Sequence, residues 1–202
     1  MIFVGDYCET ALINSKSDVY TQTAPPEEQK LWFTQQLYDL RQRVVCCVPG
    51  NHEARITKLT GINIVYDCAV TAGVADKYRQ HFAFVDIGVG QGHDNGRQVR
   101  YIGFVAHKMR DCKNYHSGDF VEGVDFVAHG HDHDPKDHSR SKLTYSNRAV
   151  VQKDIEIIDS GSFLRYGGYG ADAGYRPQST KLYKLILGGN RHKTMKTIGY
   201  HI

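Results

Sequence analysis

The sequence lacks any long hydrophobic run. Nowhere does it approach the roughly 20 consecutive apolar residues that a membrane-spanning helix requires. The amino-terminal residues also lack the basic region and the apolar stretch of a secretory signal. We therefore expect a soluble protein that resides in the cytoplasm.

Cysteine is scarce, and its spacing follows no binding pattern. There are five cysteines, an odd number, and none of them forms a Cys-x-x-Cys pair. This argues against a disulfide framework and against a zinc site built from thiolates. Buried, reduced thiols are expected instead.

Charge of one sign is not in large excess. The 25 basic and 22 acidic residues give a net charge of +3, which is too small to indicate a partner. Two local basic clusters, Lys108 to Lys113 and Arg140 to Arg148, are interpreted as solvated surface rather than as phosphate-steering patches. Since single cores extend to roughly 250 residues, we expect a single domain over residues 1–202.

The first part of the chain predicts a parallel β-α-β arrangement. Residues 2–4 and 44–48 are short apolar runs that predict buried strands. Residues 27–43 have the apolar spacing of an amphipathic helix. Weaker helical patterns follow at 53–60 and 64–71.

The later part of the chain predicts mainly strands. Residues 82–87 and 99–105 are expected to form a hairpin through a turn-rich link at 91–96. Residues 124–128 predict a further short strand.

Three more strands are expected beyond Pro135, at 149–158, 181–187 and 193–198. Parallel order early and hairpins late predict an α/β fold of two packed mixed sheets with helices outside.

Three polar motifs stand where predicted strands end. They are Gly5-Asp6, Gly50-Asn51-His52-Glu53 and Gly130-His131-Asp132-His133. Ligand sites of α/β sheets lie at the carboxyl ends of strands. Manganese, iron and zinc accept mixed carboxylate, amide and imidazole ligands, and such metals activate water for attack on phosphorus. The motifs therefore predict a metal-dependent phosphoesterase.

Each motif residue offers a distinct chemistry. Asp6 can bridge two cations, and Asn51 offers an amide oxygen. His52 needs no metal, and its ordinary pKa of about 6.5 would let it protonate a leaving alkoxide. Glu53 is assigned a structural role in the first turn of a helix.

The remaining candidates are imidazoles, at His107, His131 and His133. His131 and His133 follow the predicted strand, and we expect both to serve one site only if the chain takes a loop conformation there. We expect Gly130 to permit that loop conformation. His116 is the main rival of His107, since either could be the lone histidine between the second and third motifs.

The order of these elements resembles the calcineurin-like metallophosphoesterase superfamily. Its pattern is Gly-Asp, then Gly-Asn-His-Asp/Glu, then a lone His, then Gly-His-x-His, and the match covers residues 2–133. Segments 161–164 and 174–177 resemble the tail of small phage and bacterial members. The resemblance implies a four-layer α/β/β/α sandwich, shortened at its amino end.

The resemblance also implies roles for individual residues. Asp6 would bridge the two metals, and His52 would assist the transition state. The other ligands that it implies are Asn51, His107 and His131 for the second metal and His133 for the first.

The family's initial Asp-x-His element is absent before Asp6. We therefore expect a depleted first metal site, weak activity, and an uncovered sheet edge that favours self-association. A phosphodiesterase or nuclease is favoured over a protein phosphatase. The alternative is a catalytically silent metal-binding module that docks nucleic acid or protein.

Overall fold

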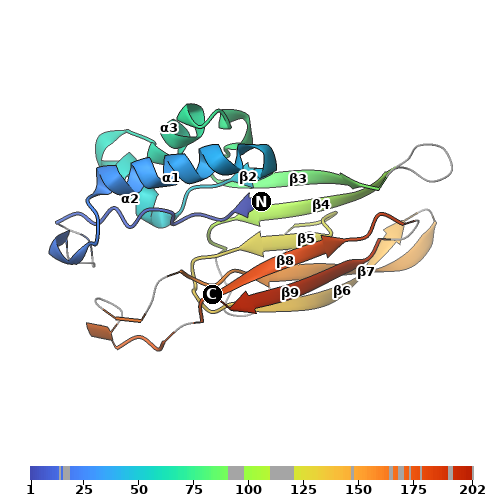
Figure 1. Ribbon diagram of the computed structural model, residues 1–202. Coiled ribbons are helices and arrows are strands. Elements are labelled where there is room, and N and C mark those ends of the chain that lie inside the picture. Colours follow the sequence, from blue (N-terminus) through green and yellow to red (C-terminus); the bar gives the residue numbers. More distant parts are fainter. Residues whose placement is uncertain are drawn as a thin grey trace. The chain divides into compact units, whose positions relative to one another are not determined.

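The helices α1 (Pro26–Leu40), α2 (Asn51–Thr60) and α3 (Ile64–Thr71) all lie in the first part of the chain (Figure 1). Two of them match the sequence patterns closely, since α3 has the predicted bounds and α1 continues into a 3-10 turn at Arg41–Arg43. Two further 3-10 turns are Val19–Thr21 and Ala75–Lys77.

The structure is a computed structural model of the chain. The residues that it describes are 1–13, 15, 19–90, 98–109, 121–146, 148–163, 166–167, 171–172, 174–177, 179–190 and 193–201. The predicted link at 91–96 and the rival ligand His116 lie outside these residues. The chain divides into two compact units, which we call unit 1 (1–83 and 164–178) and unit 2 (84–163 and 179–202). The expectation of a single domain stays a prediction.

Unit 1 contains the β-α-β arrangement predicted from the sequence. Strand β1 (Ile2–Phe3) pairs in parallel with β2 (Cys46–Cys47), and α1 lies between them in the chain. Both strands are shorter than their apolar runs. Phe33 and Leu37, four residues apart on α1, are buried in one cluster with residues of α3. Full burial of such a side chain stabilises the fold by about 1.5–3 kcal/mol.

Cysteine has the structural role expected from its spacing. Cys8, Cys46, Cys47 and Cys68 are free and buried. Burial raises the pKa of the Cys8 and Cys47 thiols to about 12. These thiols therefore stay protonated at neutral pH and act as small apolar side chains.

Unit 2 is built on a five-stranded sheet of order β3-β4-β5-β7-β6. Its strands are β3 (Phe82–Val89), β4 (Val99–Ala106), β5 (Phe126–His129), β6 (Lys136–Ser146) and β7 (Ala149–Asp159). The pairs β4–β5 and β5–β7 are parallel, and β6–β7 is antiparallel. A separate hairpin joins β8 (Lys181–Leu187) to β9 (Met195–His201).

One face of the sheet carries the apolar core of unit 2. Phe104, Val127 and Ile157 are successive cross-strand neighbours of β4, β5 and β7, and all three are buried. On β4, β5 and β7, the residues that pair as neighbours share one face because side chains alternate along a strand. The predicted mixed α/β class is confirmed.

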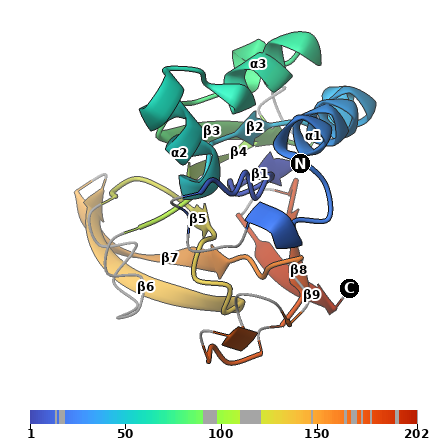
Figure 2. The same cartoon turned by 90° about the vertical axis from the view of Figure 1, so that its left-hand side faces the viewer.

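Strand β6 was not among the predicted strands. It pairs with β7 in continuous register from Lys136↔Asp159 to Ser146↔Ala149, and the two strands run side by side (Figure 2). Its sequence has no apolar face, and β6 stands at the edge of the sheet. An edge strand can be held by ladder hydrogen bonds alone, so apolar alternation is a poor guide to it.

Asp125, which precedes β5, ties several strands of unit 2 together. Its side chain is 2% exposed, and its carboxylate accepts hydrogen bonds from the backbone N–H of Ile102 (2.7 Å) and from Lys193 (2.7 Å). Lys153 on β7 lies 3.1 Å from the other oxygen.

Among the described residues, no helix is long and apolar enough to cross a membrane.

Candidate metal centre

Asp6 stands directly after β1, where the backbone takes an unusual conformation. Gly5 has φ of 94° and Asp6 has φ of 56°, in the left-handed region. The Oδ1 atom of Asp6 accepts a hydrogen bond from the backbone N–H of His52 at 3.0 Å. A Cβ atom on Gly50 would lie 2.0 Å from the same oxygen. The first two sequence motifs are therefore in direct contact, and Gly50 is required for that contact.

Glu53 fastens the loop that carries Asp6 to the start of α2. Its side chain is 1% exposed and accepts hydrogen bonds from three backbone N–H groups. The donors are Gly50 at 2.8 Å, Cys8 at 2.9 Å and Asp6 at 3.2 Å. Burial raises the pKa of Glu53, although these hydrogen bonds oppose the shift. The structural role predicted for Glu53 is confirmed.

His52 lies between two carboxylates of unit 1. Its Nδ1 atom is 2.7 Å from Glu9 Oε2, and its Nε2 atom is 3.8 Å from Asp6 Oδ2. Burial lowers the pKa of His52, but the hydrogen bond to Glu9 and the charge of Asp6 outweigh it, so the pKa is raised overall. Arg55 lies 3.6 Å from the other oxygen of Glu9. The hydrogen bond to Glu9 thereby orients the ring, and the two carboxylates favour its protonated form.

Glu9 was not among the residues predicted from the sequence. It lies in the loop after Asp6, which has no regular secondary structure. The available signal was its chemical type, since a carboxylate near the predicted strand end could orient His52. That signal is weak without coordinates, because the backbone conformation of the loop decides which side chains face the ring.

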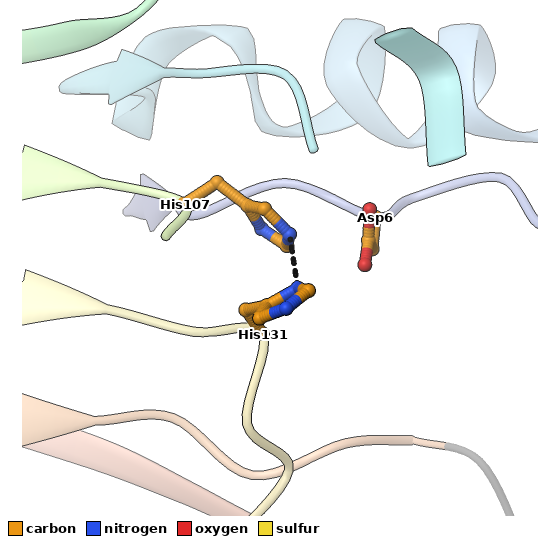
Figure 3. Close-up of side chains that lie close together, drawn as sticks. All are labelled: Asp6, His107 and His131. Atoms are coloured by element: carbon orange, nitrogen blue, oxygen red, sulfur yellow. Dashed lines mark hydrogen bonds between the residues drawn. The ribbon is translucent and has the colours of Figure 1, made fainter. Parts of the chain in front are cut away.

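His107 and His131 meet in unit 2. His107 follows β4 and is buried, and His131 follows β5. Because β4 and β5 are parallel neighbours, their carboxyl ends lie side by side. His131 Nδ1 lies 3.2 Å from His107 Nε2, and the rings are edge to face (Figure 3). Figure 3 also draws Asp6, on the segment after β1.

The expected role of Gly130 is wrong. His131 has φ of 82° and His133 has φ of 56°, while Gly130 is not among the residues with positive φ. The backbone N–H of Gly130 instead donates to the carbonyl of His107 at 3.1 Å. The loop is thus formed by the two histidines themselves. Such conformations cost about 1–3 kcal/mol each and concentrate at functional sites.

The two remaining candidate ligands are Asn51 and His133. Asn51 is the first residue of α2, and its side chain is exposed. His133 is half-buried, and within the described residues it does not join the group of ligand atoms formed around His107 and His131.

A second buried pair, His129 and Asp159, stands at neighbouring strand ends of β5 and β7. His129 Nδ1 lies 3.5 Å from Asp159 Oδ1, and His129 and Asp159 are a register pair. Burial lowers the pKa of His129 and raises that of Asp159 to about 8. Burial therefore favours the neutral form of both groups.

No protein-family model matches the chain, and no curated protein matches it. Among solved structures, the chain is similar to a conserved uncharacterised protein from Streptococcus pneumoniae TIGR4, described as a predicted phosphoesterase. The two sequences are 10% identical, the match covers 85% of this chain and 91% of that one, and the TM-score is 0.41. The likeness is a distant one.

Proposed function

We propose that this protein is a metal-dependent phosphoesterase that hydrolyses phosphodiesters. Asp6 of unit 1 and His107 and His131 of unit 2 each offer one atom suited to a metal, a carboxylate oxygen or a ring nitrogen. In this proposal the three side chains bind one divalent ion together with Asn51. Asp6 and His133 would serve a second, weaker position.

One observation carries the proposal. Five non-glycine residues of the described chain have positive φ, and Asp6, His131 and His133 are three of them. A conformation that costs free energy persists where the surrounding structure enforces it. Here it coincides with the residues that the motifs select as ligands.

The donor set fits manganese, iron or zinc. These ions accept imidazole nitrogen, carboxylate oxygen and amide oxygen in one shell. Two ring nitrogens at 3.2 Å either share one proton or direct both lone pairs at a cation. When bound, such an ion supplies a Lewis acid that activates water and neutralises charge on the phosphoryl oxygens.

The remaining chemistry comes from His52. Its raised pKa favours the protonated ring, and Glu9 holds Nδ1 so that Nε2 faces Asp6. A protonated imidazole at this position can donate to the oxygen that leaves phosphorus. Glu9 is a positioning residue in this scheme, because it acts through His52.

The test is cleavage of a bis-aryl phosphodiester by the full chain with added Mn²⁺. We expect activity that chelation abolishes and that Asp6→Asn lowers by about 100-fold or more. Asp76→Asn, which removes an exposed carboxylate elsewhere in unit 1, is the matched control and should retain full activity. Equal activity in wild type and Asp6→Asn would reject the proposal.

A silent metal-binding module is the second candidate. Within the described part of unit 2, no third His, Cys, Asp or Glu joins the group of His107 and His131. Such a sparse set favours one ion over two. Metal uptake without Mn²⁺-dependent cleavage of the bis-aryl substrate would favour this candidate.

A further inference from the structure

The buried pair His129 and Asp159 of unit 2 has no part in the proposed function. His129 ends β5 and Asp159 ends β7, and the two residues are register partners on these parallel strands. They are 3% and 8% exposed. The backbone N–H of Ser160 donates to the carbonyl of His129 at 2.8 Å, so the ladder continues past the pair. Regular β structure therefore fixes the position of both side chains.

The facing atoms of this pair make no hydrogen bond. His129 Nδ1 lies 3.5 Å from Asp159 Oδ1, and neither atom has a hydrogen-bond partner in the described part of the chain. Buried polar atoms without a partner are rare, because the water that they lose on folding is not replaced. Two such atoms that face each other indicate that a further group binds between them.

The separation of the two atoms suits a tetrahedral cation. Zinc lies about 2.0–2.2 Å from its nitrogen and oxygen ligands, so two ligands of a tetrahedral site lie about 3.4 Å apart. The 3.5 Å between His129 Nδ1 and Asp159 Oδ1 matches that separation. A direct charge-assisted hydrogen bond would instead bring the two atoms to about 2.7–2.9 Å.

Asp132 brings a second carboxylate close to the pair. It is half-buried and belongs to the third sequence motif, but the proposed function gives it no role. Burial, and after it the charge of Asp132, raises the pKa of Asp159 to about 8. Burial lowers the pKa of His129, and the backbone hydrogen bond with Gly130 and the charge of Asp132 oppose that shift. The carboxylate of Asp132 therefore lies near both groups.

The charges around the pair favour a divalent cation. Carboxylates that lie close together repel each other unless a cation stands between them. Lys136 on β6 is the register partner of Asp159, but its ammonium group pairs with Asp134. A divalent ion would balance the charges of Asp132 and Asp159.

We propose that His129, Asp159 and Asp132 bind Zn²⁺ or a chemically similar divalent ion, with water as the fourth ligand. Imidazole nitrogen and carboxylate oxygen are both common ligands of zinc. The site does not rest on the proposed phosphoesterase function, because none of its residues is a proposed ligand of that centre.

A bound ion would fix the loop that carries His131 and His133. Asp132 stands between these two residues, and both of them have positive φ. Such conformations persist where the surrounding structure enforces them. Coordination of Asp132 to an ion held by β5 and β7 would supply that constraint and stabilise the folded state.

The test is calorimetric titration of Zn²⁺ into the full chain that carries Asp6→Ala, which weakens the proposed catalytic centre and leaves every residue of this site intact. Asp159→Asn and Asp132→Asn, each added to Asp6→Ala, remove one carboxylate ligand with little change of size. Asp154→Asn removes an exposed carboxylate of β7 and is the matched control. Thermal unfolding of each protein is measured with and without Zn²⁺.

We expect Asp6→Ala to bind one equivalent of Zn²⁺ whose Kd rises at least about tenfold when Asp159 or Asp132 is replaced. Zn²⁺ at about 100 times its Kd should raise the melting temperature of Asp6→Ala by about 5 °C, and the two ligand variants should lose that shift. The Asp154→Asn control should bind Zn²⁺ within twofold of Asp6→Ala. Mn²⁺ should bind at least about tenfold more weakly than Zn²⁺, since affinity for such ligands rises from manganese to zinc.

Zinc binding that both Asp159→Asn and Asp132→Asn leave unchanged would overturn the site. Equal loss of zinc binding in the Asp154→Asn control would also overturn it, since the effect would then be one of overall charge. If zinc binds as predicted but the wild-type chain shows no Mn²⁺-dependent cleavage of the bis-aryl substrate, the zinc site stands and the phosphoesterase function fails. Cleavage together with unchanged zinc binding in the two ligand variants gives the reverse result.

Discussion

Glu53 in unit 1 and Asp125 in unit 2 are both buried carboxylates, yet their partners differ. Three backbone N–H groups surround Glu53, one of them from Asp6. Asp125 has one backbone N–H, from Ile102, and two lysines. Both side chains are at most 2% exposed.

The different partners shift the two pKa values in opposite directions. At Glu53, burial dominates and the pKa is raised. At Asp125, burial also opposes charge, but the hydrogen bonds from Lys193, Ile102 and Lys153 outweigh it and the pKa is lowered. Glu53 thus fixes a backbone loop beside a proposed ligand, whereas Asp125 is an ion-paired link between strands.

This comparison predicts its largest effect at Glu53. Replacement of Glu53 by Ala leaves three backbone N–H groups without their acceptor, at a cost of about 1–3 kcal/mol for each group that stays buried. We expect the free energy of unfolding, measured in urea, to fall by about 4 kcal/mol. Glu53→Gln should recover less than half of it, because its NH₂ group faces other donors. Full recovery would contradict an anchor made by amide donors.

Asp125→Ala should destabilise the fold by about 3 kcal/mol, because it removes the shared partner of two lysines. The effect stays below that of Glu53→Ala since both lysine side chains are partly exposed and can turn to water. Urea unfolding measures this as well. Mn²⁺ affinity of the folded variant should equal that of wild type, and a loss of affinity would erase the functional difference between the two carboxylates.

The stability supplied by Asp125 should depend on pH. Its pKa in the folded state is lowered, so its contribution is complete above the unfolded value of about 3.9 and is lost as pH falls through the folded value. Urea unfolding of wild type and Asp125→Asn between neutral pH and pH 3 checks this. The difference between their free energies of unfolding should shrink on acidification. A difference that stays constant with pH would contradict the lowered pKa of Asp125 in the folded state.

The smallest expected effect is at Glu9. Glu9→Gln keeps the size of the side chain but weakens its hold on the His52 ring, so kcat should fall about tenfold with KM unchanged. The free energy of unfolding should change by less than about 1 kcal/mol, because Glu9 is partly exposed. Steady-state kinetics on the bis-aryl substrate decides, and a rise in KM at constant kcat would show that Glu9 does not act through His52.

Elements driven by apolar side chains could be predicted from the sequence. Residues 64–71 and 181–187 form α3 and β8 with the predicted bounds. Buried apolar residues recur at helical spacing in α3, whereas β8 is rich in apolar and β-forming residues that alternate between half-buried and exposed positions. The meeting of His107 and His131 also followed from strand ends, since parallel neighbours bring their carboxyl ends together.

Features that depend on polar partners could not be predicted. Strand β6 is held by its ladder with β7, and its charged sequence has no apolar signal. His131 and His133 adopt positive φ, whereas Gly130, which would tolerate that conformation best, does not. Glu9 reaches His52 only through the shape of an irregular loop.

The most direct test of the metal site is calorimetric titration of Mn²⁺ into the full chain and into Asp6→Ala, His131→Ala and the double variant. If Asp6 and His131 bind the same ion, each single change weakens Mn²⁺ binding at least about tenfold, and the double variant loses less than the sum of the two. We predict that outcome, with one tight equivalent in wild type. Unchanged Mn²⁺ affinity in Asp6→Ala, or losses that add fully, would contradict a shared ion.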